Sequence, residues 1–146
     1  MTYALERQCI ETYFNTEWAA RTALGFDGHE FTPAHDTVQL FIQSGEAFQG
    51  SIGRASNRID HAGLVQVMVY VNSGDGSATW RSRVEGVIDT LFNKRLTSAG
   101  AVVGSGDTEF LRFSPQDQHP YIAGQERGIN LTTVTVNAPF LRYGYK

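Results

Sequence analysis

The stretch Gly63-Leu64-Val65-Gln66-Val67-Met68-Val69-Tyr70-Val71-Asn72 decides the fold class of this chain. Its four valines share one face of an extended strand, because successive side chains of a strand point to opposite sides. Leu64, Met68 and Tyr70 make the other face apolar as well. Two apolar faces are typical of a strand in the middle of a covered sheet. We therefore predict a central strand over residues 63–72, covered on both sides.

Further strands are expected on either side of this one. Residues 37–43 alternate between an apolar and a more polar face, which predicts a strand with one buried side. Residues 109–113 predict a short strand, and residues 131–137, rich in Thr and Val, predict the last one. Whether residues 47–60 form one more strand stays undecided, because their glycines weaken a strand.

Two amphipathic helices complete the pattern. Residues 3–21 and 78–96 each repeat apolar side chains at steps of three and four, which is typical of a helix with one buried face. Strands follow one another on both sides of the second helix. The sequence therefore predicts an α+β fold, with a mixed, mostly antiparallel sheet of four to five strands packed with two main helices, in a single domain over residues 1–146.

Polar residues mark the ends of the second helix and the connections after it. We expect Ser77 to cap its first amides, and Lys94 and Arg95 to lie in its last turn, where cations complement the helix dipole. Residues 97–106, rich in Gly, Ala and Ser, predict a flexible connection. Residues 114–128 predict a long polar loop, and such loops often serve a function.

Composition limits the classes of protein. The chain has 146 residues, 41% hydrophobic and 18% charged, with a formal net charge of −3, a balance typical of a globular domain. Its basic residues are scattered, so no phosphate-binding footprint is predicted. Cys9 is the only cysteine, and its helical surroundings favour an inert core position. No signal peptide or membrane span is predicted, and we expect the protein to be made and kept in the cytosol at first.

No motif points to catalysis or to a bound group. His29, His35 and Asp36 share a loop but lack the spacing of a zinc site, and His61 and His119 are interpreted as surface residues. A tight strand-to-helix turn explains the segment Gly74-Asp75-Gly76-Ser77 better than an anion cradle. We predict no catalytic residue, metal or cofactor; a small enzyme whose site forms only in space remains an alternative.

The C-terminal segment differs in kind from the rest. Residues 138–146 contain Phe140, Arg142, Tyr143 and Tyr145, and Tyr and Arg often anchor protein interfaces. Two interpretations stay open at this point. The segment is either a contact arm, whose deletion spares folding, or an edge strand of its own domain.

Several of these patterns together resemble one phage family. They are the helix ending near Trp18, the segment from Gly28 to Pro33, the valine strand, the Gly74-Asp75-Gly76 turn and a helix with Ile88, Asp89 and Phe92. In this order they are similar to the tail terminator, or tail completion, proteins of long-tailed bacteriophages, over roughly residues 1–137. Head-completion proteins, neck connectors and tail tube proteins of similar size are the competing classes.

The resemblance implies a structural virion protein without catalytic residues. It implies a ring of identical subunits, usually six, that caps the tail tube, meets the head-tail connector and lets DNA pass without specific binding. Contacts are expected in residues 25–36, 97–106 and 114–128 and in the C-terminal segment. The interface residues singled out by this hypothesis are Asp27, His29, Gly104, Gln116, Phe140, Arg142, Tyr143 and Tyr145.

Overall fold

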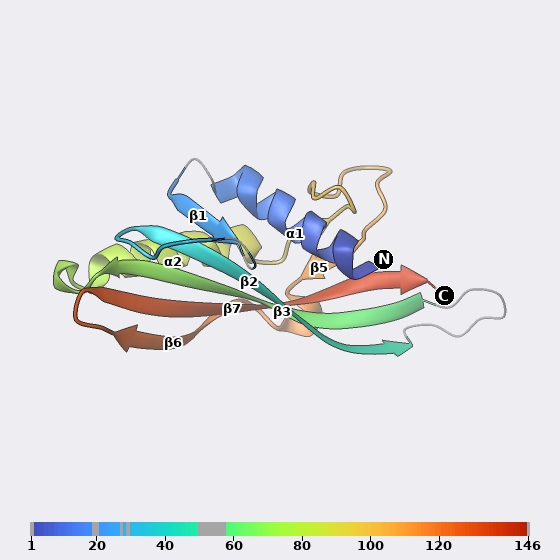
Figure 1. The fold of residues 1–146 in the computed structure, drawn as a ribbon. Coiled ribbons are helices and arrows are strands. Elements are labelled where there is room, and N and C mark those ends of the chain that lie inside the picture. The colour runs from blue at the N-terminus through green and yellow to red at the C-terminus, as the bar shows by residue number, and fades with distance from the viewer. Residues whose placement is uncertain (1, 19–20, 27, 29, 50–57, 146) are drawn as a thin grey trace.

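The computed structural model describes residues 2–18, 21–26, 28, 30–49 and 58–145. Its elements are, in chain order, α1 (Thr2–Trp18), β1 (Ala23–Phe26), β2 (Thr37–Gln49), β3 (Arg58–Asn72), η1 (Ser73–Asp75), α2 (Ser77–Leu91), β4 (Arg95–Leu96), β5 (Leu111–Phe113), η2 (Pro115–Asp117), β6 (Tyr121–Arg127) and β7 (Leu131–Tyr145). Figure 1 shows β2, β3 and β7 running along the length of the molecule, with the start of α1 near the end of β7.

The strands form one sheet in the order β1-β2-β3-β7-β5-β4, and β6 pairs with β7 in addition. β1 runs parallel to β2, and every other described pair is antiparallel. The predicted α+β class and mixed sheet are confirmed, whereas four to five strands was too few. Prediction missed β1, β4 and β6, because two of them are very short and all seven residues of β6 are exposed, so none shows a clear apolar alternation.

The hydrophobic core lies between the two helices and one face of the sheet. Val65, Val67 and Val69 of β3 are fully buried on this face. Their partners on β7 and the β2 partners of Val67 and Val69 are fully buried too, whereas Ile42, the β2 partner of Val65, is partly buried. α1 contributes the apolar side chains that its spacing predicted, and its Tyr13 hydroxyl donates a 2.6 Å hydrogen bond to the Thr90 carbonyl of α2. The helices therefore lie side by side on one layer of a two-layer fold.

The opposite face of the sheet corrects one prediction. β3 is central, between β2 and β7, but no described helix covers the face that carries Leu64, Met68 and Tyr70. The Phe31 ring reaches Tyr70 from the loop before β2, at a centroid distance of 6.3 Å. Tyr70 is buried there (8% exposed), whereas Leu64 and Met68 are half-buried, so this face is a partly covered surface rather than a second core.

The three long strands extend well past their predicted ends. β3 pairs with β7 without interruption from Arg58↔Tyr145 to Asn72↔Leu131, and β2 follows β3 to Gln49 through a register shift between Ser44 and Ala47. Polar residues interrupt the apolar alternation in these extensions, so the sequence pattern did not predict them as strands. Their backbone groups find partners in the neighbouring strand, which side-chain pattern alone does not report.

The second helix corrects its predicted ends. α2 finishes at Leu91, because Phe92 is extended and Asn93 adopts a left-handed conformation (φ 50°). Lys94 and Arg95 therefore lie beyond the helix, and no basic residue occupies its last turn. Its N-cap is Gly76, without a side-chain cap, and Ser77 is already helical. The turn from β3 into α2 is the short η1, as the tight-turn interpretation predicted.

Both predicted connections contain more structure than expected. In residues 97–106, Gly100 (φ +85°) packs so closely on α1 that a Cβ there would lie 2.9 Å from the Cys9 carbonyl, and Ala101 accepts a hydrogen bond from the Thr97 amide. Residues 114–128 include η2 and β6. Tertiary contacts order segments whose composition is typical of loops.

Candidate functional site

The predicted interface residues fall into three groups. Asp27 and His29 lie outside the described residues. Gly104 and Gln116 are exposed; the Gly104 amide donates to Asp107 at 2.8 Å, and Gln116 adopts a left-handed conformation (φ 52°). Both are placed where a partner can reach them, and their contact role stays a prediction.

The C-terminal residues form a strand rather than an arm. Tyr143 and Tyr145 pair with Asp60 and Arg58 of β3, and the segment has β3 on one side and, up to Arg142, β5 on the other. The interpretation as a free arm is therefore wrong. The edge-strand alternative is right in that the segment joins its own sheet, although β7 lies inside that sheet, and a contact role for Tyr143 and Tyr145 stays a prediction.

Two predicted contact residues are inaccessible within the subunit. Phe140 is 1% exposed, and its ring lies over Gly63, where a Cβ would come within 2.3 Å of it. Arg142 is fully buried. Neither side chain reaches a neighbour from this position, because both point to the helix side of the sheet, beneath α1 and beside β5.

Arg142 is held by a buried ion pair with α1. Its Nε donates to Glu6 Oε1 at 2.9 Å, and Ser44 Oγ donates to Glu6 Oε2 at 2.7 Å. The Tyr3 ring covers the guanidinium, with its centroid 5.1 Å from Arg142 Cζ. Since Glu6 is only 2% exposed, this carboxylate joins α1, β2 and β7 at a point shielded from water.

The same cluster contains polar atoms without a hydrogen bond. Among the described atoms, Arg142 Nη1 and Nη2 and His61 Nδ1 have no acceptor or donor partner. Burial and then the nearby Arg142 charge lower the pKa of His61 below its ordinary value of 6.5. His61 is therefore half-buried against Tyr3, at a ring distance of 5.8 Å, rather than the surface residue that we predicted.

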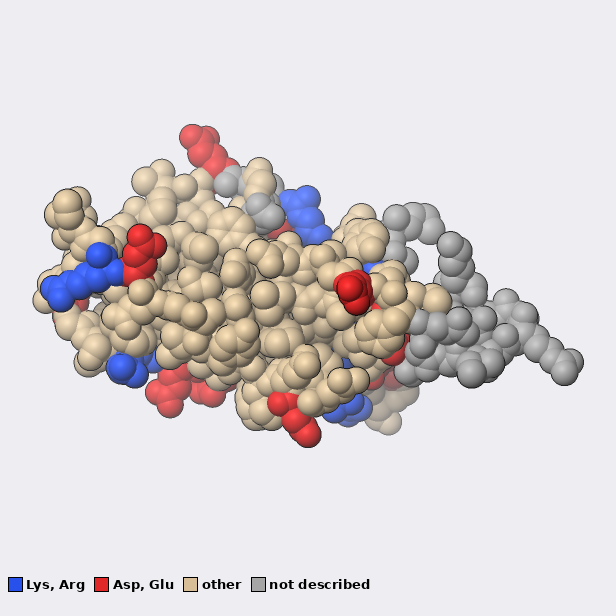
Figure 2. All heavy atoms as spheres, turned by 90° about the horizontal axis from the view of Figure 1, so that it is seen from below, with Lys and Arg blue, Asp and Glu red and all other residues tan. Residues whose placement is uncertain are grey.

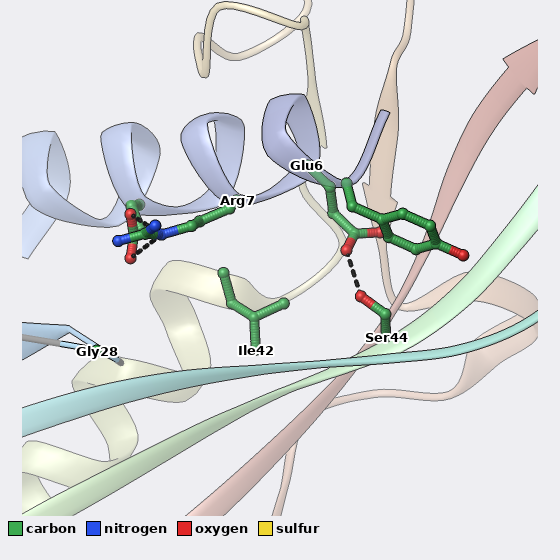
Figure 3. Close-up of a pocket in the computed structure, with 7 residues that line it drawn as sticks. Glu6, Arg7, Gly28, Ile42 and Ser44 are labelled. Atoms are coloured by element: carbon green, nitrogen blue, oxygen red, sulfur yellow. Dashed lines mark hydrogen bonds and ion pairs between the residues drawn. The ribbon is translucent and has the colours of Figure 1, made fainter. Parts of the chain in front are cut away.

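A pocket of about 290 Å³ opens beside this cluster, between α1 and β2. Figure 3 shows Glu6 and Arg7 reaching into it from α1, and Ile42 and Ser44 from β2. Gly28 borders the opposite end from Ser44. The pocket holds both carboxylate and apolar lining, so it suits a side chain with a long apolar stem and a cationic end.

The remaining candidates for chemistry are separated in space. His35 accepts a hydrogen bond from the Asn72 amide at 3.0 Å and lies 3.4 Å from Asp75, whereas Asp36 pairs with Arg83 through two bonds of 2.6 and 2.8 Å. They hold the loop before β2 against η1 and α2. Within the described part of the chain, no group of three or more His, Cys, Asp or Glu residues could hold a metal ion.

Cys9 lies in the core, as its helical position predicted. It is fully buried, its Sγ lies 3.2 Å from the Thr97 carbonyl, and burial raises the pKa of its thiol to about 12. The reactive thiolate is therefore scarce at neutral pH.

Unpaired strand edges are the prominent surface feature that the sequence did not reveal. Among the described strands β6 pairs with β7 alone, and it carries two exposed apolar side chains, Tyr121 at 50% and Ile122 at 42%. β2 pairs with β1 only over Thr37 to Leu40. From Phe41 onward, β2 has no described strand on the side away from β3.

The open sheet face next to these edges is poor in charge. Its middle consists of uncharged residues of β2, β3 and β7: Gln39, Phe41, Gln43, Leu64, Gln66, Met68, Thr133, Thr135 and Asn137. Seen from below, where β6 lies in Figure 1, the molecule shows a broad uncharged middle with most charged side chains toward its margin (Figure 2). No described helix is long and apolar enough to cross a membrane.

The fold defines an α+β protein of two layers, with two helices on one face of a seven-stranded sheet. No family model matches the chain, and no curated protein matches it. Among solved structures it is similar to a protein known by a sequence identifier alone, with a TM-score of 0.68 and 19% identity over 97% of this chain and 96% of the other. A likeness at this identity establishes a common fold.

Proposed function

We propose that this chain is a structural, non-enzymatic protein of a tailed bacteriophage, a tail terminator that caps the tail tube as a ring of identical subunits. The observation that carries the proposal is the pair of unpaired strand edges, β6 and the later part of β2, on opposite sides of one sheet. The sequence resemblance to tail terminators over roughly residues 1–137 supplies the class of assembly.

Unpaired edges favour a protein that joins copies of itself head to tail. An exposed edge presents unpaired amides and carbonyls, and proteins that stay apart usually block such edges with charge, proline or a covering segment. The charges of β6, Glu126 and Arg127, lie at one end of the strand, whereas its other end exposes the apolar side chains of Tyr121 and Ile122. Two different edges on one subunit make a heterologous interface, which closes into a ring when its rotation divides the circle. Six subunits is the number that the resemblance favours.

The other surfaces supply contacts for unlike partners. The middle of the open sheet face is uncharged, and the underside of the molecule has few charged side chains in its middle (Figure 2). Exposed faces of mixed polarity are common in contacts between proteins. We assign the tail tube protein and the head-tail connector as partners. The net charge of −3 suits a channel through which DNA passes without specific binding, and the virion tail is the proposed location.

Electron microscopy of phage particles that lack this protein tests the proposal. Overlong tails, or finished tails without heads, are expected, and the protein supplied in trans should restore normal particles. Absence of all tails would instead indicate a tube subunit, because tube proteins stack without a limit. Tails of normal length joined to heads would refute the proposal, as would turnover of a small substrate that depends on one buried acid or histidine.

A further inference from the structure

We infer that β6 of one copy adds to the unpaired edge of β2 in the next copy and places its Arg127 over the pocket between α1 and β2. This inference rests on the ring proposed above and goes beyond it, because it names the two strands, their register and one charged contact. A second copy of this chain is the occupant to which it commits.

Strand direction allows this addition. β2, β3, β7 and β6 are joined by three successive antiparallel pairings, so β6 runs opposite to β2 within one subunit. Rotation about a ring axis to which the strands are inclined keeps their relative directions and keeps the helix layer on the same side. Within one subunit Gln125 lies level with Val38, through Val134 and Val69, so pairing with the free part of β2 also displaces each copy by six residues along the strands, from Val38 to Ser44. The β6 strand of one copy then meets the β2 strand of the next in antiparallel orientation, with its inward side chains facing the neighbour's helix layer.

The side-chain pattern of the two strands matches in one register. Residues of β6 that face the helix layer are Ile122, Gln125 and Arg127, since they pair with Val136, Val134 and Thr132. The corresponding residues of β2 are Ile42, Ser44 and Ala47, since they pair with Val65, Gly63 and His61. Each strand has one register shift, between Ile122 and Gly124 in β6 and between Ser44 and Ala47 in β2.

Antiparallel superposition therefore sets Arg127 opposite Ile42, Gln125 opposite Ser44 and Ile122 opposite Ala47. In chain order the inward positions are three and then two residues apart in β6, and two and then three residues apart in β2. The spacings therefore coincide when the strands are antiparallel, and the two shifts fall opposite each other. A slip by one residue would turn every inward side chain to the other face. Because the register shift of β6 lies opposite that of β2 only in this alignment, the two shifts select this register over its alternatives.

The pocket provides a charge complement for Arg127. In this register Arg127 lies beside Ile42, and the pocket there also contains Arg7 and Glu11. Both Glu11 oxygens face Arg7 Nε at 3.1 and 3.2 Å, and carboxylate oxygens can accept more than one donor each. Arg127 is exposed within its own subunit, where a 3.5 Å contact to the Ser73 carbonyl engages one Nη. The Arg127 stem covers Ile42 while its guanidinium reaches Glu11.

Disulfide trapping in assembled particles tests the register. We expect the double variant Ser44→Cys/Gln125→Cys to form a ladder of covalently linked subunits on oxidation, because directly opposed residues lie within disulfide reach. Buried Cys9 does not interfere. The pair Gln43→Cys/Gln125→Cys, which faces opposite sides of the sheet, should stay unlinked and serves as the matched control.

Charge reversal tests the contact with Glu11. Arg127→Glu should weaken ring formation about tenfold or more per contact, and Glu11→Arg in the same chain should restore most of it. Arg81→Glu and Glu85→Arg on the exposed side of α2 are the controls and should leave assembly unchanged. Both series are read from purified particles and from sedimentation of the free protein.

The outcomes separate the two proposals. If particles contain the protein, yet the Ser44/Gln125 pair stays unlinked and Arg127→Glu assembles like the wild type, the strand pairing is wrong and the ring proposal stands. If the protein is absent from particles and stays monomeric in solution, both proposals fall. A ladder with charge rescue supports both.

Discussion

At the scale of single residues, Arg142 shows how burial decides the role of a side chain. Its guanidinium pairs with Glu6 at 2.9 Å while both groups are shielded from water. A buried pair of this kind contributes little compared with apolar residues of equal volume, but loss of one partner leaves a buried charge without compensation. Arg142 therefore connects α1 to β7, whereas its sequence context among aromatic residues suggested a contact with another protein.

Mutation of this pair should be strongly non-additive. We expect Arg142→Ala to lower the free energy of unfolding by about 3–5 kcal/mol, because Glu6 stays buried and charged. The double variant Glu6→Leu/Arg142→Met should recover most of that loss. Arg7→Ala, which removes a half-exposed guanidinium paired with Glu11 on the same helix, should cost at most about 1 kcal/mol. Urea unfolding followed by tryptophan fluorescence measures all three, and equal costs for Arg142→Ala and Arg7→Ala would contradict the assignment.

At the scale of elements, β7 holds the sheet together. Its fifteen residues pair with β3 along their whole length, and its other side receives β6 and then β5. The inward side chains of β7, from Val134 to Phe140, belong to the same buried cluster as α1 and α2. Removal of the end of this strand therefore affects the core, although the terminal segment looks dispensable in the sequence.

Truncation separates the two roles considered for this segment. A chain that ends at Leu141 loses Arg142 and the last pairings with β3, and we expect it to be largely unfolded at 37 °C or to accumulate in the insoluble fraction. A chain that ends at Gly144 keeps Arg142, and its unfolding midpoint should be close to that of the full-length protein. Far-UV circular dichroism and yield of soluble protein report the difference. The same unfolding midpoint for the Leu141 truncation and the full chain would restore the contact-arm interpretation.

At the scale of the whole molecule, one core joins both helices to the sheet. Trp18 of α1 and Trp80 of α2 are 1% and 4% exposed and belong to one buried cluster. A Cβ at Gly86 of α2 would lie 3.2 Å from the Trp18 ring, so the two helices pack without a gap. Elements that share one core are expected to unfold together.

Unfolding should consequently be a single transition. In Trp18→Phe the remaining tryptophan reports on α2, and in Trp80→Phe it reports on α1. Within each variant, tryptophan fluorescence and far-UV circular dichroism should give the same urea midpoint, although the two variants differ in stability. Separate midpoints for α1 fluorescence and circular dichroism would show that the first helix detaches before the sheet unfolds.

The sequence by itself determined the buried layer of this protein. The valines of β3 and the spacing of apolar residues in α1 and α2 predicted one strand and two helices. A buried face requires apolar side chains at the period of the element, and this period is visible in the sequence. Cys9 and the tight turn before α2 were predicted for the same local reasons. Of the proposed contact residues, Gly104 and Gln116 are exposed, as their position in predicted loops led us to expect.

Tertiary structure alone decided the site. β6 and the later part of β2 are strands because neighbouring backbones pair with them, and an edge exists only where such a neighbour is missing. Likewise, Glu6, Ser44 and Arg142 come together from three elements far apart in the sequence. Hydrogen bonding between distant strands and burial of a charged pair leave no periodic trace along the chain, so neither could be predicted before the sheet was seen.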